Sequence, residues 1–230
     1  MYSWAPRPPQ PGLLGRSLAN SNPWTVARDK AFSHYGEIAH LSVGSAKCTV
    51  SINSKISDVA KSPLGLIGDF NDECELNEFS QLLEDAFAWL RERGCKRVQG
   101  PITRHTWYPF RAVVEGFENG PLLTGEPTNG PELPKRLTSA GFAPVADYYS
   151  TITHNSGVHV SKNEQELGKA KALGYSIRCL DPAHLERDLK TIYDITLKAF
   201  SRPWNYLFHP ISFDEFKLVL GPGSSLLEPQ

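Results

Sequence analysis

The segment between residues 64 and 102 narrows the choice of fold for this 230-residue chain more than any other segment. It opens with an almost wholly apolar strand over 64–70, as is typical of a strand covered on both faces. A helix over 76–90 follows, and a second strand over 96–102 comes directly after it. Two strands joined by a helix through short connections form a parallel, right-handed crossover. The sequence therefore predicts an α/β fold.

The helix of this crossover has a single apolar face. Its apolar residues recur at steps of three, four and one, the spacing of one helical face, and they are Leu76, Phe79, Leu83, Ala86, Phe87 and Leu90. We expect Phe87 of this face to be fully buried against Leu66 of the first strand.

Further elements are predicted on either side of the crossover. Two strands over 37–43 and 47–52 are close enough to form a hairpin. Downstream, the pattern predicts a helix over 134–140, strands over 146–152 and 175–180, and between these two strands a polar helix over 163–173.

Two helix starts near the end of the chain carry clear signals. Asp181-Pro182 is an N-cap followed by proline at the first helical position. Ser212 and Glu215 have the spacing of a capping box, in which each side chain bonds the other residue's backbone N–H. Helices are therefore expected after both sites.

Composition excludes several functional classes. Lys+Arg total 24 and Asp+Glu 25, giving a net charge of -1, without the basic excess of a nucleic-acid binder. No apolar run reaches the roughly 18 residues of a membrane helix. The four cysteines are scattered, without a metal or disulfide pattern, which favours a reducing cytosol. We expect a cytoplasmic protein without metal, nucleic-acid or membrane partners.

Several short sequence motifs resemble those of a known family. They include Gly65-Leu66-Ile67-Gly68, Gly100-Pro101, Thr106-Trp107 and Gly141-Phe142, and later Leu180-Asp181-Pro182. In this order they resemble GNAT-superfamily acyl-CoA N-acyltransferases, in particular bacterial proteins with two such modules in tandem. The resemblance implies a mixed central sheet flanked by helices. It also implies acyl transfer from acetyl-CoA or another acyl-CoA to the amine of a small molecule or peptide, with self-association as a further expectation.

The resemblance divides the chain into four segments. They are a Pro-rich tail (1–25), a GNAT-like module (26–155), a linker helix (156–174) and the start of a second GNAT-like module (175–230). In the family, a Gln/Arg-x-x-Gly-x-Gly/Ala loop holds the CoA pyrophosphate. The matching place in the first module reads Asn71-Asp72-Glu73-Cys74-Glu75, with carboxylates and no glycine. We therefore expect this chain alone to bind acyl-CoA weakly or not at all, and to end before the loop of its second module.

The candidate site residues lie in the aromatic stretch after Gly100-Pro101. Glu115 is the candidate base for an amine, and Arg111 or His105 would hold an anionic substrate group. Trp107, Tyr108 and Tyr149 are further candidates for substrate binding. The alternative for Glu115 and Arg111 is a structural ion pair within a long loop. At the level of the protein, the alternative is a catalytically silent GNAT-like module that acts in binding or assembly. A hydrolase based on Cys95 is a remote third class, because Cys95 follows a helix C-terminus.

Overall fold

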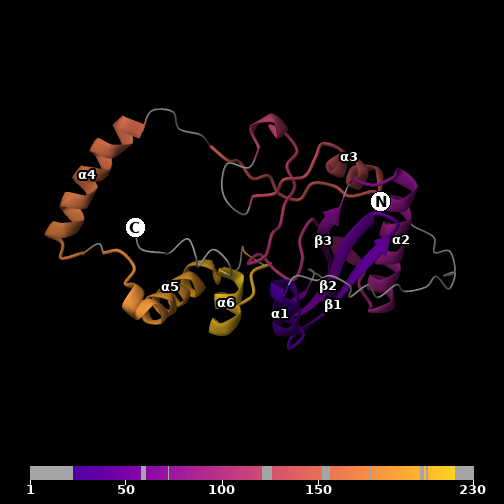
Figure 1. Cartoon of the computed structure of the whole chain (residues 1–230), viewed down its shortest axis with the longest axis horizontal. Helices are drawn as coiled ribbons and strands as arrows, with labels where there is room; N and C mark the ends of the chain where they lie inside the picture. Colours follow the sequence, from indigo (N-terminus) through magenta and orange to yellow (C-terminus); the bar gives the residue numbers. More distant parts are fainter. Residues whose placement is uncertain are drawn as a thin grey trace.

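The computed structural model contains a four-stranded mixed sheet, seen on the right in Figure 1. The structure describes residues 23–57, 61–71, 73–120, 126–151, 156–176, 178–202, 205 and 207–220. The four strands lie in the order β1-β2-β3-β4. Their bounds are β1 Gly36–Val43, β2 Ala46–Ser57, β3 Pro63–Asn71 and β4 Arg97–Gln99. The first three are antiparallel neighbours, whereas β3 and β4 are parallel.

Helices flank this sheet and continue beyond it. Their bounds are α1 Pro23–Phe32, α2 Leu76–Glu92, α3 Glu132–Ser139, α4 Ser156–Ala172, α5 Leu185–Phe200 and α6 Phe213–Leu220, with short 3-10 turns at Phe117–Asn119 (η1) and Pro182–His184 (η2). In Figure 1, α4 stands apart from the sheet, while α1 and α6 lie together. Within the described ranges, no helix is both long and apolar enough to cross a membrane.

The predicted hairpin and the crossover are both present. β1 pairs with β2, and β3, α2 and β4 form the parallel unit. The second crossover strand is shorter than predicted, because β4 ends at Gln99. The chain then leaves the ladder at Gly100-Pro101, where proline offers no backbone N–H for pairing. Ile102 instead forms an isolated bridge with Phe110.

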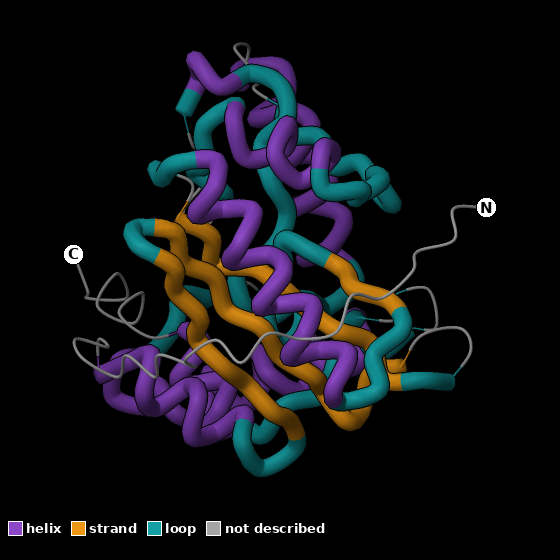
Figure 2. Tube along the Cα trace, turned by 90° about the vertical axis from the view of Figure 1, so that its right-hand side faces the viewer, coloured by secondary structure: helices purple, strands orange, loops and turns teal. Residues whose placement is uncertain are grey.

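The core has two sides, one on each face of the sheet. The α2 side is built from Val50, Ile67 and the buried face of the helix, and α2 lies across this face in Figure 2. The other side contains Ile56, Leu64, Leu66 and Ile102.

The predicted contact between Leu66 and Phe87 is wrong, although Leu66 is fully buried as expected. Alternate residues of a strand point to opposite faces, so it is Ile67 that meets α2. Leu66 faces the opposite side. Phe87 is only half-buried, with its ring 6.0 Å from that of Phe142.

A third apolar cluster joins the end of the described chain to its beginning. Tyr193, Ile211 and Phe216 are buried together, with Trp107 packed against them. Arg28 of α1 donates hydrogen bonds to the Leu218 and Val219 carbonyls of α6, at 3.4 and 3.3 Å. Helix α6 is therefore docked on α1 and on the segment after β4.

Two predicted strands are wrong. Residues 146–151 have no strand pairing and are exposed, and residues 175–180 have none either within their described positions. Both segments carry the right residue types, but a strand also needs a neighbour for its backbone groups. The predicted helices are found with shifted starts, since α3 begins at Glu132 and α4 at Ser156. Most of the predicted tail lies outside the described residues, and the division into four segments stays a prediction.

Candidate functional site

The segment from Thr103 to Arg111, which we call the aromatic loop, runs through the interior. Thr103, Arg104, His105 and Tyr108 are all buried. The Arg104 backbone N–H donates to Ser51 Oγ at 2.9 Å, and its carbonyl accepts from Asn53 Nδ2 at 3.2 Å. Both partners belong to β2. The sheet therefore fixes the start of this loop.

Four side chains from three parts of the chain meet beneath the loop. We call Tyr35, His105, Tyr108 and Glu215 the Glu215 cluster. Glu215 Oε1 accepts hydrogen bonds from the hydroxyls of Tyr35 at 2.6 Å and Tyr108 at 2.9 Å. His105 Nε2 lies 3.0 Å from the Tyr35 hydroxyl and 3.5 Å from Glu215 Oε1. The cluster thus links the turn after α1, the aromatic loop and α6.

The hydrogen bonds assign the tautomer of His105. Its Nδ1 lies 3.3 Å from the Trp107 backbone N–H, which can only donate. Nδ1 is therefore the acceptor, and the ring hydrogen of the neutral imidazole sits on Nε2, facing Tyr35 and Glu215.

The cluster holds one negative charge among neutral donors. Burial alone would raise the pKa of Glu215, but hydrogen bonds from His105, Tyr35 and Tyr108 outweigh it and lower the pKa. Burial lowers the pKa of His105, and the pull of Glu215 opposes this only in part. Burial, reinforced by Glu215, raises the pKa of both tyrosines. None of these groups is tuned to exchange a proton near neutral pH, so the cluster suits positioning better than proton transfer.

The predicted capping box at α6 is half wrong. Ser212 Oγ accepts from the Glu215 backbone N–H at 3.1 Å, as expected. The Glu215 side chain turns inward to the two tyrosines instead of returning to the helix start. The local sequence spacing does not predict that Glu215 is buried or that its partners are Tyr35 and Tyr108.

A second polar chain lies next to this cluster. Asp29 pairs with Arg104 and with His40 Nε2, the latter at 2.6 Å. His40 Nδ1 lies 2.9 Å from Thr49 Oγ1. The order Asp, His and hydroxyl is that of a nucleophile triad, but Thr49 is 3% exposed. A substrate cannot reach it, so this chain braces β1, β2 and the aromatic loop.

The structure separates the predicted site residues. Trp107 and Tyr108 join the buried region around α6. Arg111 lies against the rings of both Phe110 and Tyr148, with its Cζ 4.8 and 4.9 Å from their centroids. Glu115 is exposed, and Tyr149 is 90% exposed. Among the residues that the structure describes, no ion pair joins Glu115 to Arg111, and the salt bridges involve other residues.

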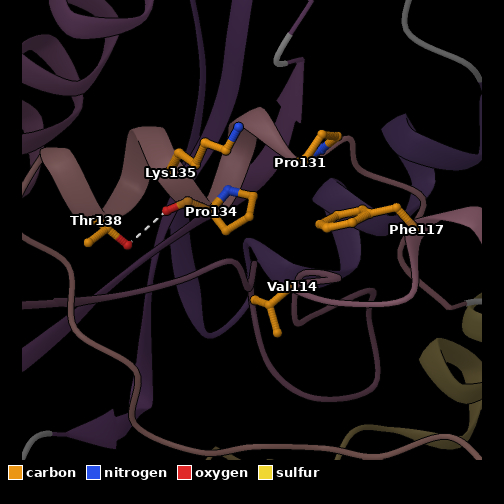
Figure 3. Close-up of a pocket in the computed structure, with 6 residues that line it drawn as sticks. All are labelled: Val114, Phe117, Pro131, Pro134, Lys135 and Thr138. Carbon is orange, nitrogen blue, oxygen red and sulfur yellow. Dashed lines mark hydrogen bonds between the residues drawn. The ribbon is translucent and has the colours of Figure 1, made fainter.

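A shallow pocket of about 470 Å³ lies between the segment after the aromatic loop and α3. Six residues line it: Val114, Phe117, Pro131, Pro134, Lys135 and Thr138. In Figure 3, Val114 and Phe117 face the prolines across the opening, while Lys135 extends along the helix. Glu115 is exposed and directly follows the lining residue Val114 in sequence, but it is not itself among the residues that line this mainly apolar pocket.

The turn between β3 and α2 does not fit a diphosphate. Glu73 and Glu75 are exposed there, and the Glu78 carboxylate fills the space beside Gly44, whose added Cβ would lie 1.9 Å from it. The nearby guanidinium of Arg136 donates to the carbonyl and sulfur of Cys74, at 2.9 and 3.1 Å. At this helix start, a diphosphate would therefore meet more carboxylates than free hydrogen-bond donors. Among the residues described, no group of three or more His, Cys, Asp and Glu could hold a metal ion.

Comparisons with known proteins give two likenesses. A bacterial ceramide synthase from Caulobacter vibrioides (strain NA1000 / CB15N) is 24% identical over 145 residues, which cover 62% of this chain. They cover 36% of that protein, so the chain spans about a third of its length. A crystal structure of a probable acetyltransferase matches 57% of this chain and 77% of its own, at 12% identity and a TM-score of 0.34. No protein-family model matches.

Proposed function

We propose that this protein is an acyltransferase that joins an acyl group to an amine. The observation that carries the proposal is that Glu115 is exposed and lies in the short segment from Val114 to Phe117, both ends of which line the pocket. The likeness to a bacterial ceramide synthase over 145 residues supports it, because a ceramide is an amide made from an amine and an acyl group.

Amide formation needs a group that accepts a proton. The amine nitrogen attacks the carbonyl carbon of an acyl thioester, the C–S bond breaks and the sulfur leaves as a thiolate. The nitrogen must lose one proton in the process, and we assign that proton to Glu115. An exposed carboxylate beside an apolar pocket can receive it, while the pocket takes the apolar part of the substrate.

The remaining residues position this site. The Glu215 cluster holds the aromatic loop against α6, and Asn129 holds the segment beyond it. Asn129 Oδ1 accepts from the Val113 backbone N–H at 2.8 Å, and its Nδ2 donates to the Val113 carbonyl at 3.0 Å. These two bonds fix the backbone next to Val114 and Glu115. Trp107, Tyr108, Arg111 and Tyr149 remain proposed substrate-binding residues, of which Trp107 and Tyr108 would act through the shape of the loop.

The acyl donor in this proposal is an acyl thioester such as acyl-CoA. The β3–α2 turn does not fit the diphosphate of CoA, so we assign no recognition of that group to it. The acidic turn is also the observation that favours a second candidate, a binding or assembly module without catalysis.

The test replaces Glu115 with glutamine and follows amide formation from an acyl thioester and a primary amine by mass spectrometry. Glu84 is the control, since it is also exposed but lies on α2, outside the segments that line the pocket. We expect Glu115→Gln to lower kcat by about 100-fold or more, and Glu84→Gln to leave it unchanged.

Two results would contradict the proposal. Equal rates for the parent and Glu115→Gln would remove Glu115 as the base. An amide yield no greater than that of a protein-free mixture would reject catalysis and leave the binding module.

A further inference from the structure

Arg111 lies where ligands commonly bind in α/β sheets. Its backbone N–H donates to the Pro101 carbonyl at 2.8 Å, two residues after β4 ends. The next residue, Ile102, donates from its backbone to Ile67 of β3 at 2.8 Å. Arg111 is therefore tied to the carboxyl end of β4, on the side of the sheet where open α/β sheets bind ligands.

The Arg111 side chain is held by rings. Its Cζ is 4.8 Å from the Phe110 centroid and 4.9 Å from the Tyr148 centroid, and these two rings meet edge to face at 5.7 Å. Phe110 packs on the core, whereas Tyr148 is 58% exposed. Two cation–π contacts thus orient a guanidinium at the edge of the protein.

The charge of Arg111 has no counterpart in the described part of the chain. No carboxylate there pairs with it, and its Nε is buried without a hydrogen-bond partner. Arg104 differs in its charge pairing, because that guanidinium contacts both Asp29 and Asp69, although its Nε is likewise buried without a hydrogen-bond partner. What sets Arg111 apart is therefore the lack of a paired carboxylate, a place that an anionic ligand can take.

The backbone at Arg111 is also strained. Its φ is +79°, in the left-handed region that residues with a side chain seldom adopt. Such strain persists where surrounding contacts enforce it, often at ligand sites. Here the bond to Pro101 and the two rings enforce it.

We propose that Arg111, held against the rings of Phe110 and Tyr148, binds an anionic group, a carboxylate or a phosphate, on the amine acceptor. A planar guanidinium can bind such a group through two parallel hydrogen bonds. Within the same proposal, the acceptor that presents its anion to Arg111 presents its amine to Glu115, which follows four residues later in the chain. That the anion belongs to an amine acceptor rests on the proposed function. The anion site itself is tested by binding alone.

The direct probe is the Arg111 side-chain N–H resonance, assigned by its loss in Arg111→Lys. It is followed by NMR while acetate, inorganic phosphate, β-alanine or propylamine is added at constant ionic strength. We expect saturable shifts with the three anion-bearing probes, at dissociation constants on the order of millimolar, and none with propylamine, which has the amine but no carboxylate. The control Arg97→Gln removes one positive charge from an exposed position on β4 and should leave these shifts intact.

A second variant tests the anion site even if Arg111→Lys fails to fold. Tyr148→Ala removes one ring at a largely exposed position and should weaken binding of β-alanine several-fold. In acyl-transfer assays, Arg111→Lys should lower kcat/KM for β-alanine about tenfold or more beyond any loss seen with propylamine.

Three outcomes would overturn the inference. The first is the absence of a saturable shift with any anion, and the second is an equal loss of binding in Arg97→Gln. The third is binding of CoA at least tenfold tighter than that of phosphate or β-alanine, because the anion would then belong to the acyl donor. Anion binding without any acyl transfer would instead contradict the proposed function and leave the anion site standing.

Discussion

Glu215 accepts hydrogen bonds from two phenols that belong to distant parts of the chain. Tyr35 and Tyr108 both donate to its Oε1; Tyr108 and Glu215 are buried, and Tyr35 is half-buried. A buried hydroxyl that loses its acceptor costs free energy, because water no longer reaches it. The docking of α6 therefore depends on one carboxylate as well as on apolar packing.

Replacing Glu215 with alanine should lower the free energy of unfolding by about 2–5 kcal/mol, since two buried hydroxyls lose their acceptor. Glu215→Gln keeps a carbonyl oxygen and should cost less. Chemical denaturation of both variants measures the difference. A free energy of unfolding for Glu215→Ala within about 0.5 kcal/mol of the parent would contradict the described cluster.

The sequence indicates some of these residues and not others. The aromatic stretch around Trp107 and Tyr108 is conspicuous because rings and prolines are dense there, and both residues are in the region that meets α6. Glu215 has the spacing of a capping residue, and nothing local shows that its carboxylate turns inward. No sequence pattern around Tyr35 predicts its role, because its hydrogen-bond partners are separated from it by 70 and 180 residues.

At the level of elements, local periodicity predicts helices better than it predicts lone strands. The crossover of β3, α2 and β4 is correct because each element shows its own period and the joints are short. The segments over 146–151 and 175–180 fail because pairing depends on a neighbour that sequence spacing does not reveal.

The two faces of β3 give a quantitative test of the core. Leu66 is fully buried and Phe87 only partly, so the two truncations should differ. Leu66→Ala should lower the free energy of unfolding by about 2–5 kcal/mol. Phe87→Ala should cost less, despite the larger side chain, because part of it already contacts solvent.

Thermal or denaturant unfolding of the two variants distinguishes these expectations. A larger loss for Phe87→Ala than for Leu66→Ala would contradict the assignment of faces on β3. The double variant should show additive losses, because the two side chains belong to opposite sides of the sheet.

At the level of the whole molecule, two observations meet at the carboxyl ends of β3 and β4. The helix start next to β3 is rich in carboxylates, whereas the loop after β4 leads to Arg111, Glu115 and the pocket. In the proposed acyltransferase, the loop after β4 binds the substrates and carries the base. The helix start next to β3 does not recognise a diphosphate. Such a protein should depend on the thioester of its donor and little on the nucleotide part of CoA.

The most direct test compares two acyl donors with the same acyl group, acyl-CoA and the acyl thioester of N-acetylcysteamine, which lacks the diphosphate. Mass spectrometry of the amide product gives kcat/KM for each donor with one primary amine. We expect amide formation from both donors, with kcat/KM values within about threefold of one another, a difference of less than 1 kcal/mol. The proposed acyl transfer is contradicted if neither donor yields amide above the protein-free rate. The lack of diphosphate recognition is contradicted if acyl-CoA is preferred by 100-fold or more, about 2.7 kcal/mol.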